Sequence, residues 1–328
     1  MKLTRSSLTS QLLALLCLFL ISGCGDSANS NDNPAYSEAP AGGRVAHVNW
    51  STYNLYSYQE GVWVPIISRG AVIDEFPIIG DRPSIILHGL GSDIRSGRFD
   101  NVADGLVASG SSAVFGFEYD SLDSIAKNGG YFFEALTALT EESPNTDWRI
   151  AGHSMGALVA RVALENEVPL DVAEGSRAVL IAGPHTGSEV ADEIQDRGDV
   201  IGEALGDLIL NGRLEFRNVD GSLVNVTGDE EGFTDLRLGS PFLQTQNFEA
   251  ANRHPQFPYL TLAGNDRGDD YEALNRVLGV FADDGVVNID SANAPVIGAI
   301  NSEVLPYDHS TIAEAPEAVA AILTFMGF

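Results

Sequence analysis

One short stretch, Trp148 to Arg161 (WRIAGHSMGALVAR), restricts the possible folds of this chain more than any other. Apolar Ile150 and Ala151 lead into a G-x-S-x-G turn with Ser154 at its apex, and helix-forming residues follow. A strand that turns this sharply into a helix needs glycine at both flanks, because side chains there would collide. The stretch therefore predicts a strand, a tight turn and a helix, with the Ser154 hydroxyl exposed above a sheet.

Apolar strands alternate with helical segments on both sides of this stretch. Besides the strand before Ser154, the predicted strands are Val62–Ser68, Pro83–Leu90, Ser112–Tyr119, Arg177–Ala182 and Tyr259–Ala263. The predicted helices are Phe99–Ser109, Ser124–Glu142 and the helix after Ser154, to about Glu167. Short buried strands separated by helices are typical of a parallel sheet covered on both faces, so the fold class is α/β. Pro65 places its strand at a sheet edge.

The alternation lapses between Gly187 and Pro258. Helical spacing of apolar residues continues from Val190 to Leu210, and a less regular part follows. An insertion of this length (187–258) within a folded domain of 45–328 predicts a cap or lid over a site. The alternative is a surface excursion packed on the sheet edge.

The N-terminus has the pattern of an export signal. A positive start precedes the apolar run Leu12–Ile21, which is too short to span a bilayer. The run ends in Ile21-Ser22-Gly23-Cys24, which resembles the bacterial lipobox. The resemblance implies a signal peptide over residues 1–23, lipid attachment at Cys24 and a flexible tether over 24–44. We expect an exported, lipid-anchored envelope protein, and Gly25 favours the outer over the inner membrane. The alternative is an ordinary signal peptide.

Composition excludes one class of partner. The chain has 18 Lys and Arg against 46 Asp and Glu, a formal net charge of −28. A nucleic-acid partner is excluded, because neutralising phosphates needs a basic face. Both cysteines, Cys17 and Cys24, lie in the N-terminal segment, so the folded domain has no disulfide and no cysteine metal site.

A serine nucleophile needs a base, and the order of residues favours His309. It follows the last strand-like stretch and precedes the C-terminal helix, the place of the base in chains ordered Ser, acid, His. His185, after a strand in GPHTGS, is the main rival. The others occupy less suitable positions: His47, His88, His153 and His254.

Three aspartates between Ser154 and His309 are candidates for the acid that orients the base. Asp284 is favoured because it directly precedes Gly285 at a tight turn into apolar residues. Asp283 shares that turn, and Asp266 follows the Tyr259–Ala263 strand. Otherwise each is a turn-capping aspartate.

An oxyanion site needs two backbone N–H donors. Met155, directly after Ser154, supplies one. The HGLG segment after the Pro83–Leu90 strand supplies the other through Leu90, because its glycines let the backbone turn inward.

Six segments in order resemble the α/β-hydrolase lipases and esterases: LHGLG, IAGHSMGALVAR, AGPHTGS, GSPFLQTQN, DDGVV and YDHSTI. The resemblance is to the branch of bacterial triacylglycerol lipases and lipases similar to GPI inositol-deacylases. It implies an α/β-hydrolase fold with Ser154 as nucleophile, His309 as base, Asp284 as acid, and Leu90 and Met155 as oxyanion donors. Ser310 and Thr311 stand where lipases of this branch often have an H-x-D calcium ligand, so no metal or cofactor is carried over.

The predicted activity is hydrolysis of carboxylic esters, with an acyl-ester or lipid substrate, through an acyl-enzyme. An acyltransferase or amidase with the same three residues is the alternative within enzymes. A catalytically silent surface binding protein is the alternative outside them. The insertion is less apolar than the lid of a strongly interfacial lipase. The sequence therefore leaves open whether the enzyme is a lipase or an esterase.

Overall fold

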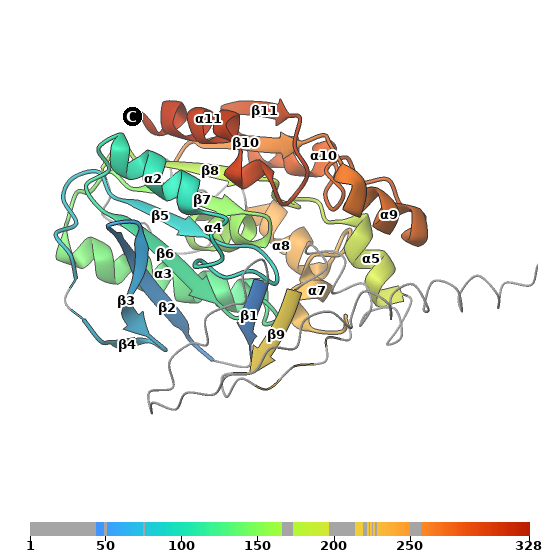
Figure 1. The fold of residues 1–328 in the computed structure, drawn as a ribbon, viewed down its shortest axis with the longest axis horizontal. Coiled ribbons are helices and arrows are strands. Elements are labelled where there is room, and N and C mark those ends of the chain that lie inside the picture. The colour runs from blue at the N-terminus through green and yellow to red at the C-terminus, as the bar shows by residue number, and fades with distance from the viewer. Residues whose placement is uncertain are drawn as a thin grey trace, which may run out of the picture. The chain divides into compact units, whose positions relative to one another are not determined.

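A nine-stranded, mostly parallel sheet organises the chain (Figure 1). The computed structural model describes residues 44–48, 51–74, 76–165, 173–196, 214–218, 222, 224, 226, 228–249 and 257–328. The strand order is β11-β10-β8-β7-β5-β6-β2-β3-β4. Neighbours from β11 to β6 are parallel, and those from β6 to β4 are antiparallel. The bounds are β2 Tyr53–Gln59, β3 Val62–Ser68, β4 Ala71–Val72, β5 Ser84–Leu87, β6 Val114–Tyr119, β7 Arg149–His153, β8 Arg177–Ile181, β10 Tyr259–Gly264 and β11 Asn301–Leu305.

Helices cover both faces of this sheet. On β5, Ile85 and Leu87 belong to the core under α3 (Ile125–Glu142) and α4 (Met155–Glu165). Ile86, between them, belongs to the core under α2 (Asp100–Ala108) and α11 (Pro316–Met326). Because side chains of a strand alternate between faces, a strand apolar at every position must be buried on both sides.

The predicted strands and helices are confirmed with small shifts at their ends. Ser124 is the N-cap of α3, and its hydroxyl accepts a hydrogen bond from the Lys127 amide at 3.2 Å. One detail was wrong: β3 is not the edge strand. The two-residue β4 lies outside it but pairs only with Ile67 and Ser68, so it does not reach Pro65.

The 187–258 segment holds three described helices, α5 (Glu189–Asp196), α7 (Glu231–Asp235) and α8 (Pro241–Glu249). It also holds β9 (Leu214–Asn218), which pairs in parallel with β1 (Arg44–Val48) in a separate two-stranded sheet. The remaining helices after this segment are α9 (Gly268–Leu278) and α10 (Ile289–Ala292), with short 3-10 turns at Pro295–Ile297 and Ile312–Glu314.

The predicted signal peptide, Cys24 and most of the tether lie outside the described residues, as do His254 and most of the predicted 190–210 helix beyond Asp196. Those expectations stay predictions. Within the described ranges, no helix is long and apolar enough to cross a membrane.

Candidate active site

Ser154 sits on a strained turn between β7 and α4. Its φ is +54°, a left-handed conformation that non-glycine residues rarely adopt. The Ser154 amide donates to the Ile181 carbonyl of β8 at 2.8 Å, which fixes the turn to the sheet. A Cβ on Gly156 would lie 2.3 Å from the His88 carbonyl oxygen, and one on Gly152 would lie 2.6 Å from that of Gly156. Both glycines are therefore required by the close approach of helix to strand, as the sequence predicts.

The structure brings His309 to Ser154 from the other end of the chain. His309 lies in the turn between β11 and α11, and its Nε2 is 2.8 Å from the Ser154 Oγ. The His309 carbonyl accepts from the ring of His153, at 2.8 Å from Nε2, so His153 holds the backbone of the base in place.

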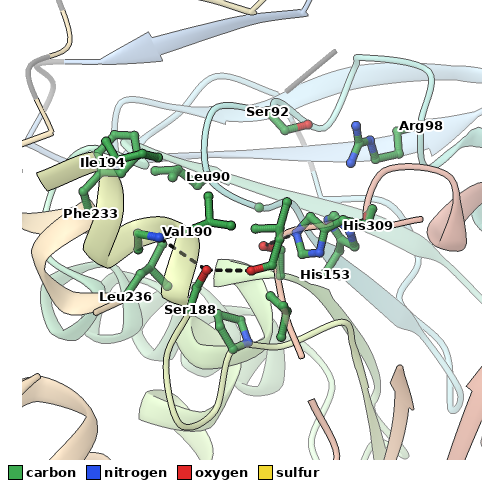
Figure 2. A pocket seen from close by; sticks show the side chains of 16 residues that line it. Leu90, Ser92, Arg98, His153, Ser188, Val190, Ile194, Phe233, Leu236 and His309 are labelled. Carbon is green, nitrogen blue, oxygen red and sulfur yellow. Dashed lines mark hydrogen bonds between the residues drawn. The ribbon is translucent and has the colours of Figure 1, made fainter. Parts of the chain in front are cut away.

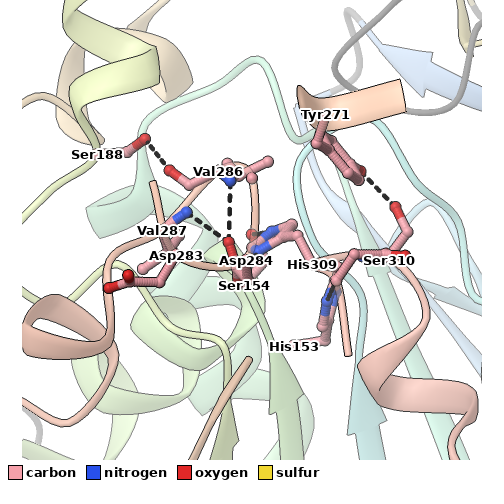
Figure 3. Close-up of polar contacts among 12 residues, drawn as sticks. His153, Ser154, Ser188, Tyr271, Asp283, Asp284, Val286, Val287, His309 and Ser310 are labelled. Atoms are coloured by element: carbon pink, nitrogen blue, oxygen red, sulfur yellow. Dashed lines mark hydrogen bonds and ion pairs between the residues drawn. The ribbon is translucent and has the colours of Figure 1, made fainter. Parts of the chain in front are cut away.

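Asp284 completes a chain of hydrogen bonds (Figure 3). Its Oδ2 lies 2.8 Å from His309 Nδ1, and its Oδ1 accepts from the amides of Val286 at 2.9 Å and Val287 at 2.7 Å. The His309 amide donates to the Asp284 carbonyl at 2.9 Å. Because a carboxylate can only accept, His309 Nδ1 carries the ring proton, and Nε2 accepts from the Ser154 hydroxyl.

All three side chains are buried, and α9 supports the turn that carries Asp284. Within α9, Asn275 donates to the Gly285 carbonyl at 2.7 Å and accepts from the Ala282 amide at 2.8 Å. Gly285 has a φ of +95°, and a Cβ there would lie 2.3 Å from the Cβ of Tyr271. The predicted glycine turn is therefore present, in the loop that follows α9.

The rival residues lie elsewhere. Asp283 accepts from the Ile289 amide at 2.8 Å, and Asp266 accepts from the Gly268 amide at 3.1 Å, so both cap local backbone. His185 is fully buried, and its Nδ1 lies 3.4 Å from a guanidinium nitrogen of Arg161. Burial and the nearby Arg161 charge hold the pKa of His185 well below its ordinary value.

The HGLG segment packs directly against the nucleophile. A Cβ on Gly89 would lie 2.9 Å from the Ser154 Cβ, so only glycine allows this approach. The neighbouring Leu90 lines the same pocket as Ser154, and Met155 begins α4, where the first amides lack intrahelical acceptors. Both predicted oxyanion donors therefore flank Ser154, and their role stays a prediction.

His88 holds this segment in place. Tyr119 donates to it twice, from its hydroxyl to the His88 carbonyl at 2.6 Å and from its amide to Nε2 at 3.2 Å. The two rings stack with centroids 4.2 Å apart. Because Nε2 accepts from the Tyr119 amide, the ring is neutral and its Nδ1 donates to the Gly89 carbonyl at 2.8 Å. Burial lowers the pKa of His88 in the same sense.

A small pocket of about 40 Å³ opens beside Ser154 (Figure 2). Leu90 and the helices α5 and α7 supply an apolar end through Val190, Ala191, Ile194, Phe233 and Leu236. Ser92, Arg98 and His153 lie at the other end, near His309. No group of three or more potential metal-ligating side chains occurs in the described ranges.

Sequence reasoning missed two contributors to this site. Ser188 lies in a segment quoted for its family resemblance, but only the structure shows its hydroxyl donating to the Val286 carbonyl at 2.6 Å. Arg98 lies ten residues after His88 in HGLGSDIRSGR, and nothing in that sequence distinguishes it from Arg95. The sequence did offer one signal for Arg98, since it is a cation close to the predicted oxyanion loop in a chain that has few cations.

No protein-family model matches the chain, and a search by sequence finds no curated relative. Solved structures are similar in fold. Bacillus licheniformis lipase BlEst2 in its mature form superposes with a TM-score of 0.57 at 16% identity, over 85% of this chain and 100% of that one. Phospholipase PlaB from Legionella pneumophila gives 0.54 at 15% identity, over 75% of this chain and 59% of that one.

Carboxylesterase CesB from Bacillus subtilis gives a TM-score of 0.50 at 14% identity, over 86% of this chain and 90% of that one. Identities this low establish the arrangement of helices and strands and not the activity. Together with the sheet order and the turn at Ser154, they show that the chain has the α/β-hydrolase fold.

Proposed function

We propose that this protein is a serine hydrolase of carboxylic esters that works through an acyl-enzyme. The observation that carries the proposal is the unbroken chain of hydrogen bonds from Ser154 through His309 to Asp284. The acid also accepts from two further amides, which hold its side chain in place within the buried site. Ser, His and Asp in this order activate a hydroxyl for attack on a carbonyl carbon.

In the proposed reaction, Ser154 Oγ attacks the acyl carbonyl while His309 Nε2 takes the hydroxyl proton. Asp284 holds the imidazolium that forms, and the amides of Leu90 and Met155 stabilise the oxyanion. The C–O bond to the alcohol then breaks, and His309 gives its proton to the leaving oxygen. Water, deprotonated by the same histidine, attacks the acyl-enzyme and releases the acid.

The solved structures of similar fold support the class of reaction, since they are a lipase, a phospholipase and a carboxylesterase. The six sequence segments favour the finer placement beside bacterial triacylglycerol lipases and lipases similar to GPI inositol-deacylases. That placement remains a proposal, as does the preference for water over an alcohol or amine acceptor.

We further infer that the 187–258 segment is a lid. The pocket beside Ser154 is narrow, with a volume of about 40 Å³. Its apolar wall comes from α5 and α7. Movement of these helices would widen the path of an ester to Ser154, and the apolar side chains on them suit an acyl chain.

Labelling with a fluorophosphonate probe tests the hydrolase proposal. The probe phosphonylates an activated serine, so the wild-type protein should become labelled at Ser154, and Ser154→Ala should not. Hydrolysis of a soluble ester should be lost in the same variant. A wild-type protein that resists the probe and cleaves no ester would leave a catalytically silent binding protein as the better interpretation.

A further inference from the structure

Arg98 is a buried cation without a partner in the part of the chain that the structure describes. It lies between β5 and α2 and is only 2% exposed. Its Nε and one terminal guanidinium nitrogen, Nη2, are buried and make no hydrogen bond. A guanidinium stays protonated at any pH at which the protein is folded, so Arg98 cannot relieve this burial by losing its charge.

A second buried arginine, Arg161, has hydrogen-bond partners that Arg98 lacks. Arg161 is fully buried and donates to both carboxylate oxygens of Glu165, at 2.9 and 3.0 Å, and to Asn247 at 3.1 Å. A buried charge left unpaired costs several kcal/mol of stability. The burial of Arg98 without such partners therefore indicates a group that arrives from outside the chain.

The position of Arg98 indicates where its partner from outside the chain would bind. Arg98 lines the same pocket as Ser154 and His309. In Figure 2 the guanidinium end of Arg98 is turned toward Ser92 and lies on the same side of the pocket as His309, whereas Ile194 and Phe233 lie on the opposite side. Because His309 must reach the departing oxygen to protonate it, the alcohol part of an ester occupies the His309 side. The acyl part then faces the apolar wall.

We propose that Arg98 binds an anionic group on the alcohol part of the substrate. The substrate is then an acyl ester of an alcohol that carries a phosphate or a carboxylate, and this assignment rests on the proposed hydrolase function. A guanidinium pairs with a phosphate or a carboxylate through parallel N–H donors. Ser92 lies at the same end of the pocket, and its hydroxyl donates to the Asp93 carbonyl at 3.5 Å. The net charge of −28 repels anions in general, so recognition depends on this local cation.

Two esters that share one acyl chain test the proposal: 1-acylglycerol, which is neutral, and 1-acylglycerol 3-phosphate. Wild-type kcat/KM should be higher for the phosphate ester. Arg98→Gln should lower kcat/KM for that ester by about tenfold to a hundredfold, the range for a lost hydrogen bond to a charged group. The value for the neutral ester should change little, and Arg98→Lys should recover part of the loss.

Arg276→Gln is the matched control, because it removes the same charge from an exposed pair with Glu272 on α9. It should leave both values unchanged. Equal loss of activity on both esters in Arg98→Gln, or no wild-type preference for the phosphate ester, would overturn the assignment. Hydrolysis of the neutral ester with labelling of Ser154 would keep the hydrolase proposal intact in either case.

Inhibition of the wild-type protein gives a second readout that does not depend on folding of a variant. Glycerol 3-phosphate should compete with the ester substrate, and glycerol should not. If inorganic phosphate competes as well as glycerol 3-phosphate while the esters show no preference, the site takes a free anion and the substrate assignment fails.

Discussion

At the scale of residues, Asp284 fixes the site before any substrate arrives. Two amides hold its Oδ1, which leaves Oδ2 for His309 Nδ1. The amide of His309 binds the Asp284 carbonyl, so the two residues are joined at the backbone and at the side chain. The imidazole therefore has one orientation and one tautomer, and only its Nε2 faces Ser154.

Asp284→Asn should abolish most activity without unfolding the protein. The amides of Val286 and Val287 still need an acceptor, so the new carboxamide turns its oxygen to them and its NH₂ to His309. The ring proton then moves to Nε2, which can no longer accept from Ser154. We expect kcat on a soluble ester to fall by about a thousandfold to ten-thousandfold, the scale of this change in serine proteases.

Asp266→Asn is the control, because Asp266 is exposed, accepts from the nearby Gly268 amide and should tolerate the change. The reverse result, a large loss in Asp266→Asn and little in Asp284→Asn, would assign the acid to Asp266. The two variants thus separate Asp284 from Asp266, two of the three candidates that the sequence leaves open.

Individual residues could be predicted where chain order restricts them. His309 follows from its place after Ser154 and before the last helix, and Asp284 from the glycine after it. Asn275 and Arg98 could not be predicted, since their roles depend on which loops meet in space. An asparagine inside a helix has no local feature that points to a turn ten residues away.

At the scale of elements, one arginine joins the two helices that cover the pocket. Arg237, just after α7, donates to Asp192 at 2.8 Å, to Gln195 at 2.6 Å and to Asp196 at 2.8 Å, all on α5. These contacts are partly exposed, so water can replace them when the helices separate. They hold the closed arrangement weakly, which suits a lid that must open.

Arg237→Gln should favour the open arrangement. Partly exposed ion pairs contribute at most about 1 kcal/mol, so kcat/KM on a soluble short-chain ester should rise by up to about fivefold. The measurement is an acyl-ester series below and above the aggregation limit of the substrate. The wild-type rate should jump at that limit, and the jump should be smaller in the variant.

Arg276→Gln, which breaks a surface pair on α9, should behave as the wild type. If the wild-type rate crosses the aggregation limit smoothly and Arg237→Gln changes nothing, α5 and α7 are a fixed wall and the lid proposal fails.

At the scale of the whole molecule, burial decides what the sequence could predict. The central parallel strands are apolar at nearly every position, so the strands and their alternation with helices could be predicted from the sequence. β11 (NSEVL) is mostly exposed and is held by pairing with β10, so nothing in its composition identifies it. β2 was also missed. Its two-residue turn to β3, Glu60-Gly61, has φ values of +51° and +83°, but glutamate is not among the asparagine, aspartate and glycine residues that indicate such a turn in a sequence.

Two buried histidines make the stability of the whole molecule sensitive to acid. Burial lowers the pKa of His88, and burial with the Arg161 charge lowers that of His185 further. Below the ordinary histidine pKa, these two histidines therefore bind protons in the unfolded chain but stay neutral in the folded chain. Stability is fully present above that pKa and falls as the pH drops below it.

We expect the free energy of unfolding to fall by at most about 1.4 kcal/mol per pH unit for each such histidine below pH ~6.5. Urea unfolding between pH 7.5 and 5.5 measures this slope. His185→Gln should be less stable than the wild type at both pH 7.5 and pH 5.5. Its free energy of unfolding should depend less steeply on pH, because one fewer histidine takes up a proton on unfolding. Comparing slopes cancels groups common to both proteins, such as Asp100, whose pKa burial raises. A wild-type slope retained in His185→Gln would show that this histidine is protonated in the fold, against the burial that the structure gives it.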